Sequence, residues 1–129
     1  MVEFLPLIQH LCKRPGMYVI LAQMGTVMAY IDGFNAAREG EPLAGFREWL
    51  IVRANGGNNL AWQGIVRCML RPKMTVDEFC ESNDEQLFES LANLITEFHD
   101  ERNKFGKDKI LHQYEQWRRE NIPVIKKRL

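Results

Sequence analysis

The sequence predicts an all-α protein, a single compact bundle of about six or seven short helices. Apolar residues recur at intervals of three and four along most of the chain, and no segment alternates convincingly between apolar and polar residues. Short breaks rich in Gly, Pro or Asn separate the periodic segments. A chain of 129 residues is long enough to bury a core, so we expect one helical domain over residues 1–129.

The first predicted helix has one apolar face, formed by Phe4, Leu7, Ile8, Leu11 and Cys12. Pro15-Gly16 breaks the chain after it, and we expect the short apolar run Met17–Ala22 to be extended. A second helix is expected from Gly25 or Thr26 to Glu39. Gly33 inside that helix costs stability unless another backbone approaches it.

Pro42 is predicted to start the third helix, and the run NGGNN at 55–59 to form a loop. Asn59 is a candidate cap for the fourth helix, which must end before Pro72. Thr75-x-x-Glu78 has the spacing of a capping box and predicts a short fifth helix. Ser82-x-x-Glu85 has the same spacing and predicts the start of a sixth.

The stretch 83–101 is the best candidate for the element around which the other helices pack. Its apolar residues fall on one helical face, namely Leu87, Phe88, Leu91, Leu94, Ile95 and Phe98. Glu85, Glu89, Glu97 and Asp100 fall opposite them. A last helix follows the break at Phe105-Gly106, with Asp108 as a candidate cap, and a basic tail is expected at about 122–129.

Charge is balanced overall but divided along the chain. Seventeen basic and seventeen acidic residues cancel, which argues against direct binding of nucleic acid. Nine acidic residues and no Lys or Arg lie between 77 and 101, whereas nine basic and three acidic residues lie between 102 and 128. The molecule is therefore expected to have an acidic and a basic pole.

Three features predict a cytoplasmic protein. Cys12, Cys68 and Cys80 are an odd number without a CxxC pair, which indicates reduced, largely buried thiols. The N-terminus has an acidic residue and periodic apolar positions, unlike a signal peptide. No apolar run is long enough to span a membrane, so no membrane partner is expected.

We expect no catalytic site, metal site or cofactor. His10, His99 and His112 lack HExxH spacing and are expected to be surface or capping residues. Eight residues separate Arg102-Asn103 from His112, against about four in helical ribonucleases of the HEPN kind. KRPGMY at 13–18 is similar to a segment of type II topoisomerase ATPase domains, but the Glu and Asn that should follow on a helix are missing, so ATP binding is not expected.

A longer set of motifs covers the first half of the chain: RPGMYV at 14–19, YIDGFNAA at 30–37, LAGFREWLIVR at 43–53 and NNLAW at 58–62. Their order resembles that of immunity proteins encoded beside contact-dependent growth inhibition or polymorphic toxins. The resemblance implies a non-catalytic inhibitor that binds the C-terminal domain of one cognate toxin, often a nuclease, and blocks its active site or substrate path.

The acidic residues provide a physical route for such binding, because a nuclease cleft must be positive to attract phosphates. The predicted docking surface consists of Asp77, Glu78, Glu81, Asp84, Glu85 and Glu89, extended by Glu97, Asp100 and Glu101. The alternative is that these residues only stabilise their own helices, since an acidic residue in a first turn stabilises a helix by about 0.3–1 kcal/mol.

Two other functional classes remain open. A small cytoplasmic adaptor would bind a protein partner through an apolar groove, and a helical enzyme would show a pocket where titratable side chains converge. Trp49, Trp62 and Trp117 would suit a binding surface, but their helical positions predict core packing instead.

Overall fold

The structure is a computed structural model that describes residues 3–122. Within that range the chain forms seven α-helices and one 3-10 turn, and no strand. The elements are α1 (Phe4–Lys13), η1 (Pro15–Met17), α2 (Met24–Ala37), α3 (Phe46–Ala54), α4 (Trp62–Leu70), α5 (Val76–Glu81), α6 (Glu85–Phe105) and α7 (Lys107–Asn121). The all-α prediction is therefore confirmed. The predicted basic tail lies almost wholly outside the described residues.

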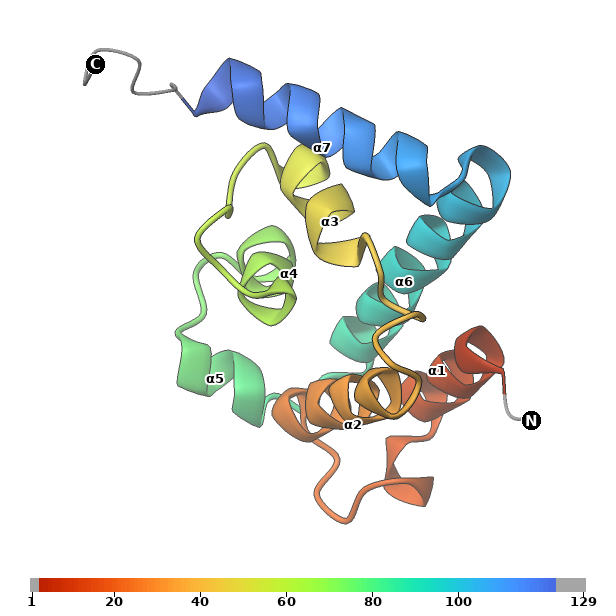
Figure 1. The fold of residues 1–129 in the computed structure, drawn as a ribbon. Helices are drawn as coiled ribbons and strands as arrows, with labels where there is room; N and C mark the ends of the chain where they lie inside the picture. The colour runs from red at the N-terminus through yellow and green to blue at the C-terminus, as the bar shows by residue number, and fades with distance from the viewer. Residues whose placement is uncertain (1–2, 123–129) are drawn as a thin grey trace.

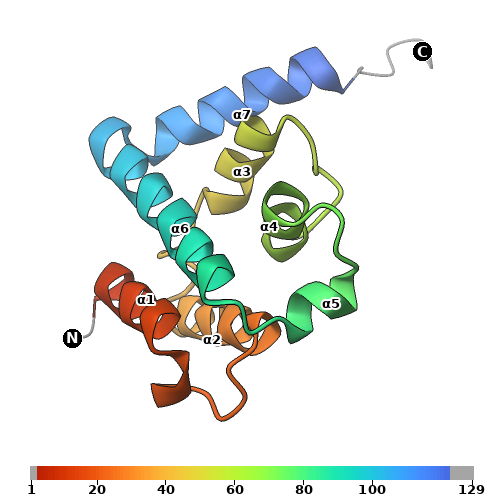
Figure 2. The same cartoon turned by 180° about the vertical axis from the view of Figure 1, so that it is seen from behind.

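The longest helix, α6, is the element against which the others pack. It contacts α1, α3, α4 and α7, and its most extensive contact is with α1. Figures 1 and 2 show α1, α2 and α5 at the end of the molecule where α6 begins, and α7 lying across the end where α6 stops. At about 1.5 Å per residue, the 21 residues of α6 separate these two ends by about 30 Å.

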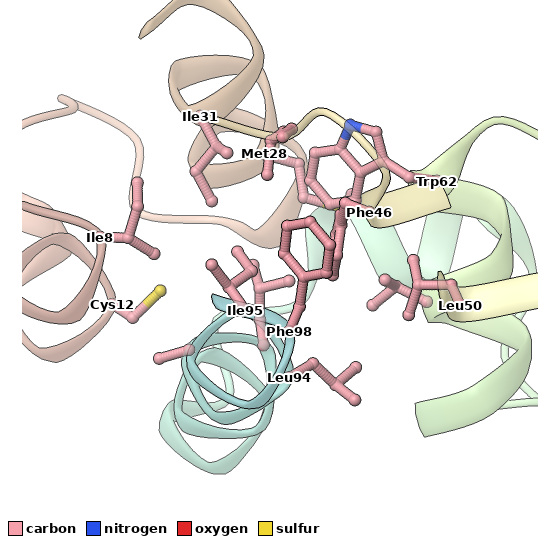
Figure 3. Packing of buried hydrophobic residues seen from close by; sticks show 14 of the residues in the cluster. Ile8, Cys12, Met28, Ile31, Phe46, Leu50, Trp62, Leu94, Ile95 and Phe98 are labelled. Atoms are coloured by element: carbon pink, nitrogen blue, oxygen red, sulfur yellow. The ribbon is translucent and has the colours of Figure 1, made fainter. Parts of the chain in front are cut away.

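The apolar face of α6 forms one side of a single contiguous core. All six predicted core residues of α6 are buried, while Glu85, Glu89 and Asp100 are exposed. Figure 3 shows side chains from α1, α2, α3 and α4 converging on this face. Aromatic rings lie at the centre, where Phe46 of α3 and Phe98 of α6 have ring centroids 5.1 Å apart. Burial of this apolar area is the main force that holds the bundle together.

The start of α6 differs from the prediction. Asp84 is the N-cap, and its Oδ1 accepts a hydrogen bond of 2.9 Å from the backbone N–H of Gln86. Ser82 is the C-cap of α5, and its carbonyl oxygen accepts a bond of 2.8 Å from the backbone N–H of Met24 in α2. The predicted Ser82-x-x-Glu85 capping box is wrong, because Oγ of Ser82 accepts a bond of 3.3 Å from the backbone N–H of Asp84 and the helix is capped by Asp84. The Thr75-x-x-Glu78 box is confirmed.

Three other helix starts are displaced from their predicted positions. α3 begins at Phe46 and not at Pro42, because Gly45 has φ +90°, which a right-handed helix cannot contain. The N-cap of α4 is Ala61 and not Asn59, and that of α7 is Gly106 and not Asp108. Nε of Arg47 in α3 donates a bond of 2.8 Å to the carbonyl of Leu60, in the loop that precedes α4.

The segment Met17–Ala22 is not extended as predicted. Its first residue, Met17, ends η1, and turns and bends follow. The backbone N–H of Val19 donates a bond of 3.0 Å to the carbonyl of Pro15. The close approach considered for Gly33 occurs instead at Gly25. A Cβ there would lie 3.2 Å from both Cβ and the carbonyl oxygen of Cys80, so Gly25 lets α2 pack against α5.

Two predictions about polar and sulfur side chains are also wrong. His99 is neither a surface nor a capping residue, because only 8% of it is exposed. Cys68 is exposed, whereas Cys12 is buried and Cys80 is half-buried, so the thiols are free but not uniformly buried. His10 and His112 are exposed as expected.

Candidate partner-binding surface

Helix α5 presents its acidic residues to solvent because its one buried side chain, Phe79, faces the core. The backbone N–H of Glu78 donates a bond of 3.1 Å to Oγ1 of Thr75, and Oε1 of Glu78 accepts one of 2.9 Å from the backbone N–H of Thr75. The bonds from Thr75 hold the pKa of Glu78 below its usual range. Asp77 and Glu81 are exposed beside it.

The first turns of α6 continue this acidic character. Asp84 caps the helix and also lies 3.3 Å from Nη2 of Arg71, in a half-exposed ion pair. Glu85 and Glu89 are exposed one turn apart and line a hollow of about 560 Å³ against α1, where Lys13 is the facing basic residue. Together, α5 and the start of α6 carry six exposed carboxylates, called the acidic surface below: Asp77, Glu78, Glu81, Asp84, Glu85 and Glu89.

The structure does not bring the other three predicted residues into this surface. Glu97 forms an ion pair with Arg53 of α3. Glu101 is half-buried, and its carboxylate accepts a hydrogen bond from the indole nitrogen of Trp49. Asp100 is exposed, but 15 residues of helix place it about 22 Å along α6 from Glu85. The predicted extension therefore belongs to the opposite end of α6, where it packs against α3 and lies close to α7.

That opposite end contains a groove of about 510 Å³ between α3, α6 and α7. Its walls carry both charges and aromatic rings, including Trp49, Arg53, Glu101, Phe105, Lys109 and Trp117. Trp49 and Trp62 are buried, which confirms their predicted core packing, while Trp117 is half-buried and donates a bond of 2.7 Å from Nε1 to Oδ1 of Asn55. The groove is a second candidate binding site, separate from the acidic surface.

No protein-family model, curated protein or solved structure matches this chain. The resemblance to immunity proteins therefore stays a prediction. In residues 3–122, no three His, Cys, Asp or Glu side chains are grouped so that they could share a metal ion. None of the helices described is both long and apolar enough to cross a membrane.

One surface feature was missed from the sequence. The end of η1 and its connection to α2 hold three large apolar side chains in solvent: Met17 is 69% exposed, Ile20 106% and Leu21 56%. The sequence contained a weak signal, because this apolar run follows Pro15-Gly16 and lacks helical periodicity. Local pattern alone does not distinguish an apolar turn in solvent from a buried one.

Proposed function

We propose that this protein is an immunity protein that binds the C-terminal domain of a cognate toxin, a nuclease, in the cytoplasm of the producing cell. The observation that carries the proposal is the acidic surface, six exposed carboxylates on two consecutive helices with no Lys or Arg from 76 to 101. Such a surface would occupy the positive cleft of a nuclease in place of the phosphates of its substrate.

The acidic surface has the physical properties that fast, specific inhibition needs. Its carboxylates project from helices that are fixed at their first turns by the Thr75 and Asp84 caps. A fixed charge pattern steers an oppositely charged partner into the correct orientation and raises its association rate. Arg71 is paired with Asp84, and Lys13 lines the same hollow as Glu85 and Glu89, so six carboxylates face two basic side chains and the surface stays negative.

Helix capping does not explain every residue of the surface. Asp77, Glu78 and Glu85 lie in first turns, where the helix dipole favours an acid even without a partner. Glu81, however, is the last residue of α5, where the dipole disfavours an acid, and Glu89 lies one turn beyond the start of α6. These two positions favour a role in binding over a purely local one.

The test is a triple charge reversal, E81K/E85K/E89K, which leaves both capping residues unchanged. The probe is the purified toxin domain encoded immediately beside the gene of this protein. We expect association to slow by about tenfold or more at low salt, with a weaker salt dependence, because the steering field is removed. Inhibition of the nuclease should weaken in parallel.

The matched control reverses three exposed acids elsewhere, in the variant E39K/D108K/E120K. It changes the net charge by the same amount, so an effect of total charge alone would slow both variants equally. We expect the control to associate nearly as fast as the wild type. Equal rates for the two variants, or a wild-type protein that does not bind the neighbouring toxin domain, would overturn the proposal.

The groove between α3 and α7 supports a second candidate function, that of an adaptor for a protein partner. Phe105 is 49% exposed at the groove, and Trp117 lies half-buried in its wall. An adaptor that uses this groove would keep its affinity in E81K/E85K/E89K and lose it in W117A. The toxin-binding proposal predicts the reverse: E81K/E85K/E89K should weaken binding and W117A should not.

A further inference from the structure

Three exposed apolar residues lie ahead of α2, namely Met17 at the end of η1 and Ile20 and Leu21 in the connection that follows, and they are called the apolar loop below. Ile20 is fully exposed, and more than half of each of the other two side chains is in contact with solvent. Scattered single apolar residues on a surface need no explanation, but here three exposed ones lie within five positions of the chain. Clustered exposure of large apolar side chains favours a role in binding.

The apolar loop is held in place at both ends. Backbone N–H groups of Met17 and Val19 donate to the carbonyls of Arg14 and Pro15, at 3.1 and 3.0 Å. At the other end the N–H of Gln23 donates to the carbonyl of Leu21 at 2.9 Å, and the hydroxyl of Thr26 donates to the same carbonyl. A loop ordered in this way loses little conformational entropy when it binds.

The loop leads directly to the acidic surface. Met24, which begins α2, donates its backbone N–H to the carbonyl of Ser82 in the connection between α5 and α6. That connection lies between Glu81 and Asp84, two members of the acidic surface. Figure 2 shows the loop and the α5–α6 connection at the same end of the molecule.

We infer that the apolar loop is the hydrophobic anchor of the same interface and inserts into an apolar pocket beside a basic surface on the toxin domain. The inference rests on the proposed function. In protein interfaces a few buried apolar side chains supply most of the affinity, while the surrounding polar residues contribute orientation and association rate. The apolar loop would supply affinity, and the acidic surface would supply orientation and a high association rate.

Charge distinguishes between the partners that could bind the apolar loop. An anionic membrane surface would be repelled by the acidic surface, which includes both sides of the α5–α6 connection that Met24 contacts, although Lys13 and Arg14 precede the loop. A second copy docked through the same face would bring two acidic surfaces together, which opposes association. A basic protein with an apolar pocket matches both features at once.

The test is the variant I20S/L21S, measured against the same neighbouring toxin domain. We expect its dissociation rate to rise by about tenfold or more while its association rate and salt dependence stay near wild type, because the steering charges are intact. I20L, which keeps the apolar area, should retain the wild-type dissociation rate. L111S is the matched control, since Leu111 is an exposed apolar residue on α7, away from the acidic surface.

The outcomes distinguish failure of the loop assignment from failure of the proposed function. Toxin binding by I20S/L21S with an unchanged dissociation rate would overturn the role of the loop and leave the proposed function standing. Failure of the wild type to bind would overturn both. Wild-type dimerisation in sedimentation, or binding to phosphatidylserine–phosphatidylcholine vesicles, that is lost in I20S/L21S would also overturn the assignment of the loop to the toxin. Unchanged thermal unfolding of the variants checks that the fold is preserved.

Discussion

Nε2 of His99 lies 2.9 Å from the backbone oxygen of Pro42, and this contact joins α6 to the loop that precedes α3. The imidazole also stacks on the ring of Phe4 in α1, with a centroid distance of 5.2 Å. One buried side chain therefore links three parts of the bundle. Burial lowers the pKa of His99 below its ordinary value of 6.5, and the nearby positive charge of Arg102 lowers it further.

The stability of the fold should therefore depend on the protonation of His99. The unfolded chain takes up a proton at His99 near pH 6.5, whereas the folded protein does so only at lower pH. Stability from this residue is fully present above pH 6.5 and is lost as the pH falls through the lower folded pKa. We expect the free energy of unfolding to fall more steeply for the wild type than for H99Q between about pH 7.5 and 5.5, measured by urea titration. Parallel pH profiles would contradict this assignment.

The bond between Trp49 and Glu101 predicts that Glu101 acts in stability and not in partner binding. Removing the acceptor in E101A leaves the indole N–H of a 95% buried tryptophan unpaired, which should cost about 1–3 kcal/mol. E101Q keeps an oxygen acceptor and should recover most of that loss in chemical denaturation. Neither variant should alter the rate of association with the toxin domain. A slower rate in both would extend the acidic surface to this end of α6.

The three cysteines should differ in reactivity. Burial raises the pKa of the Cys12 thiol to about 12, so its thiolate is scarce near neutral pH and its side chain is shielded from reagents. Cys68 is exposed and should react first with iodoacetamide in the native protein. We expect mass spectrometry to show alkylation of Cys12 only after unfolding. Equal labelling of Cys12 and Cys68 in the folded state would show that α1 opens readily from α6.

Local signals correctly predicted the elements that depend on periodicity and on a single cap. The apolar face of 87–98 and the Thr75-x-x-Glu78 box are examples, because both depend on residues that neighbour one another in the chain. Ser82 and Asp84 both carry a side chain that can cap α6, and the structure uses Asp84, while the carbonyl of Ser82 accepts a hydrogen bond from Met24, 58 positions away in the chain. No local pattern contains that bond.

The sequence by itself determined the helical class of this protein, the burial of one face of α6 and the exposure of most of its acidic residues. Only the tertiary structure decided how the nine acids are divided: six lie on α5 and the start of α6, Glu97 and Glu101 are engaged by Arg53 and Trp49, and Asp100 is exposed farther along α6. The physical reason is that helical periodicity determines which side of a helix faces solvent. The partner of a residue on that side depends instead on which distant helix packs beside it.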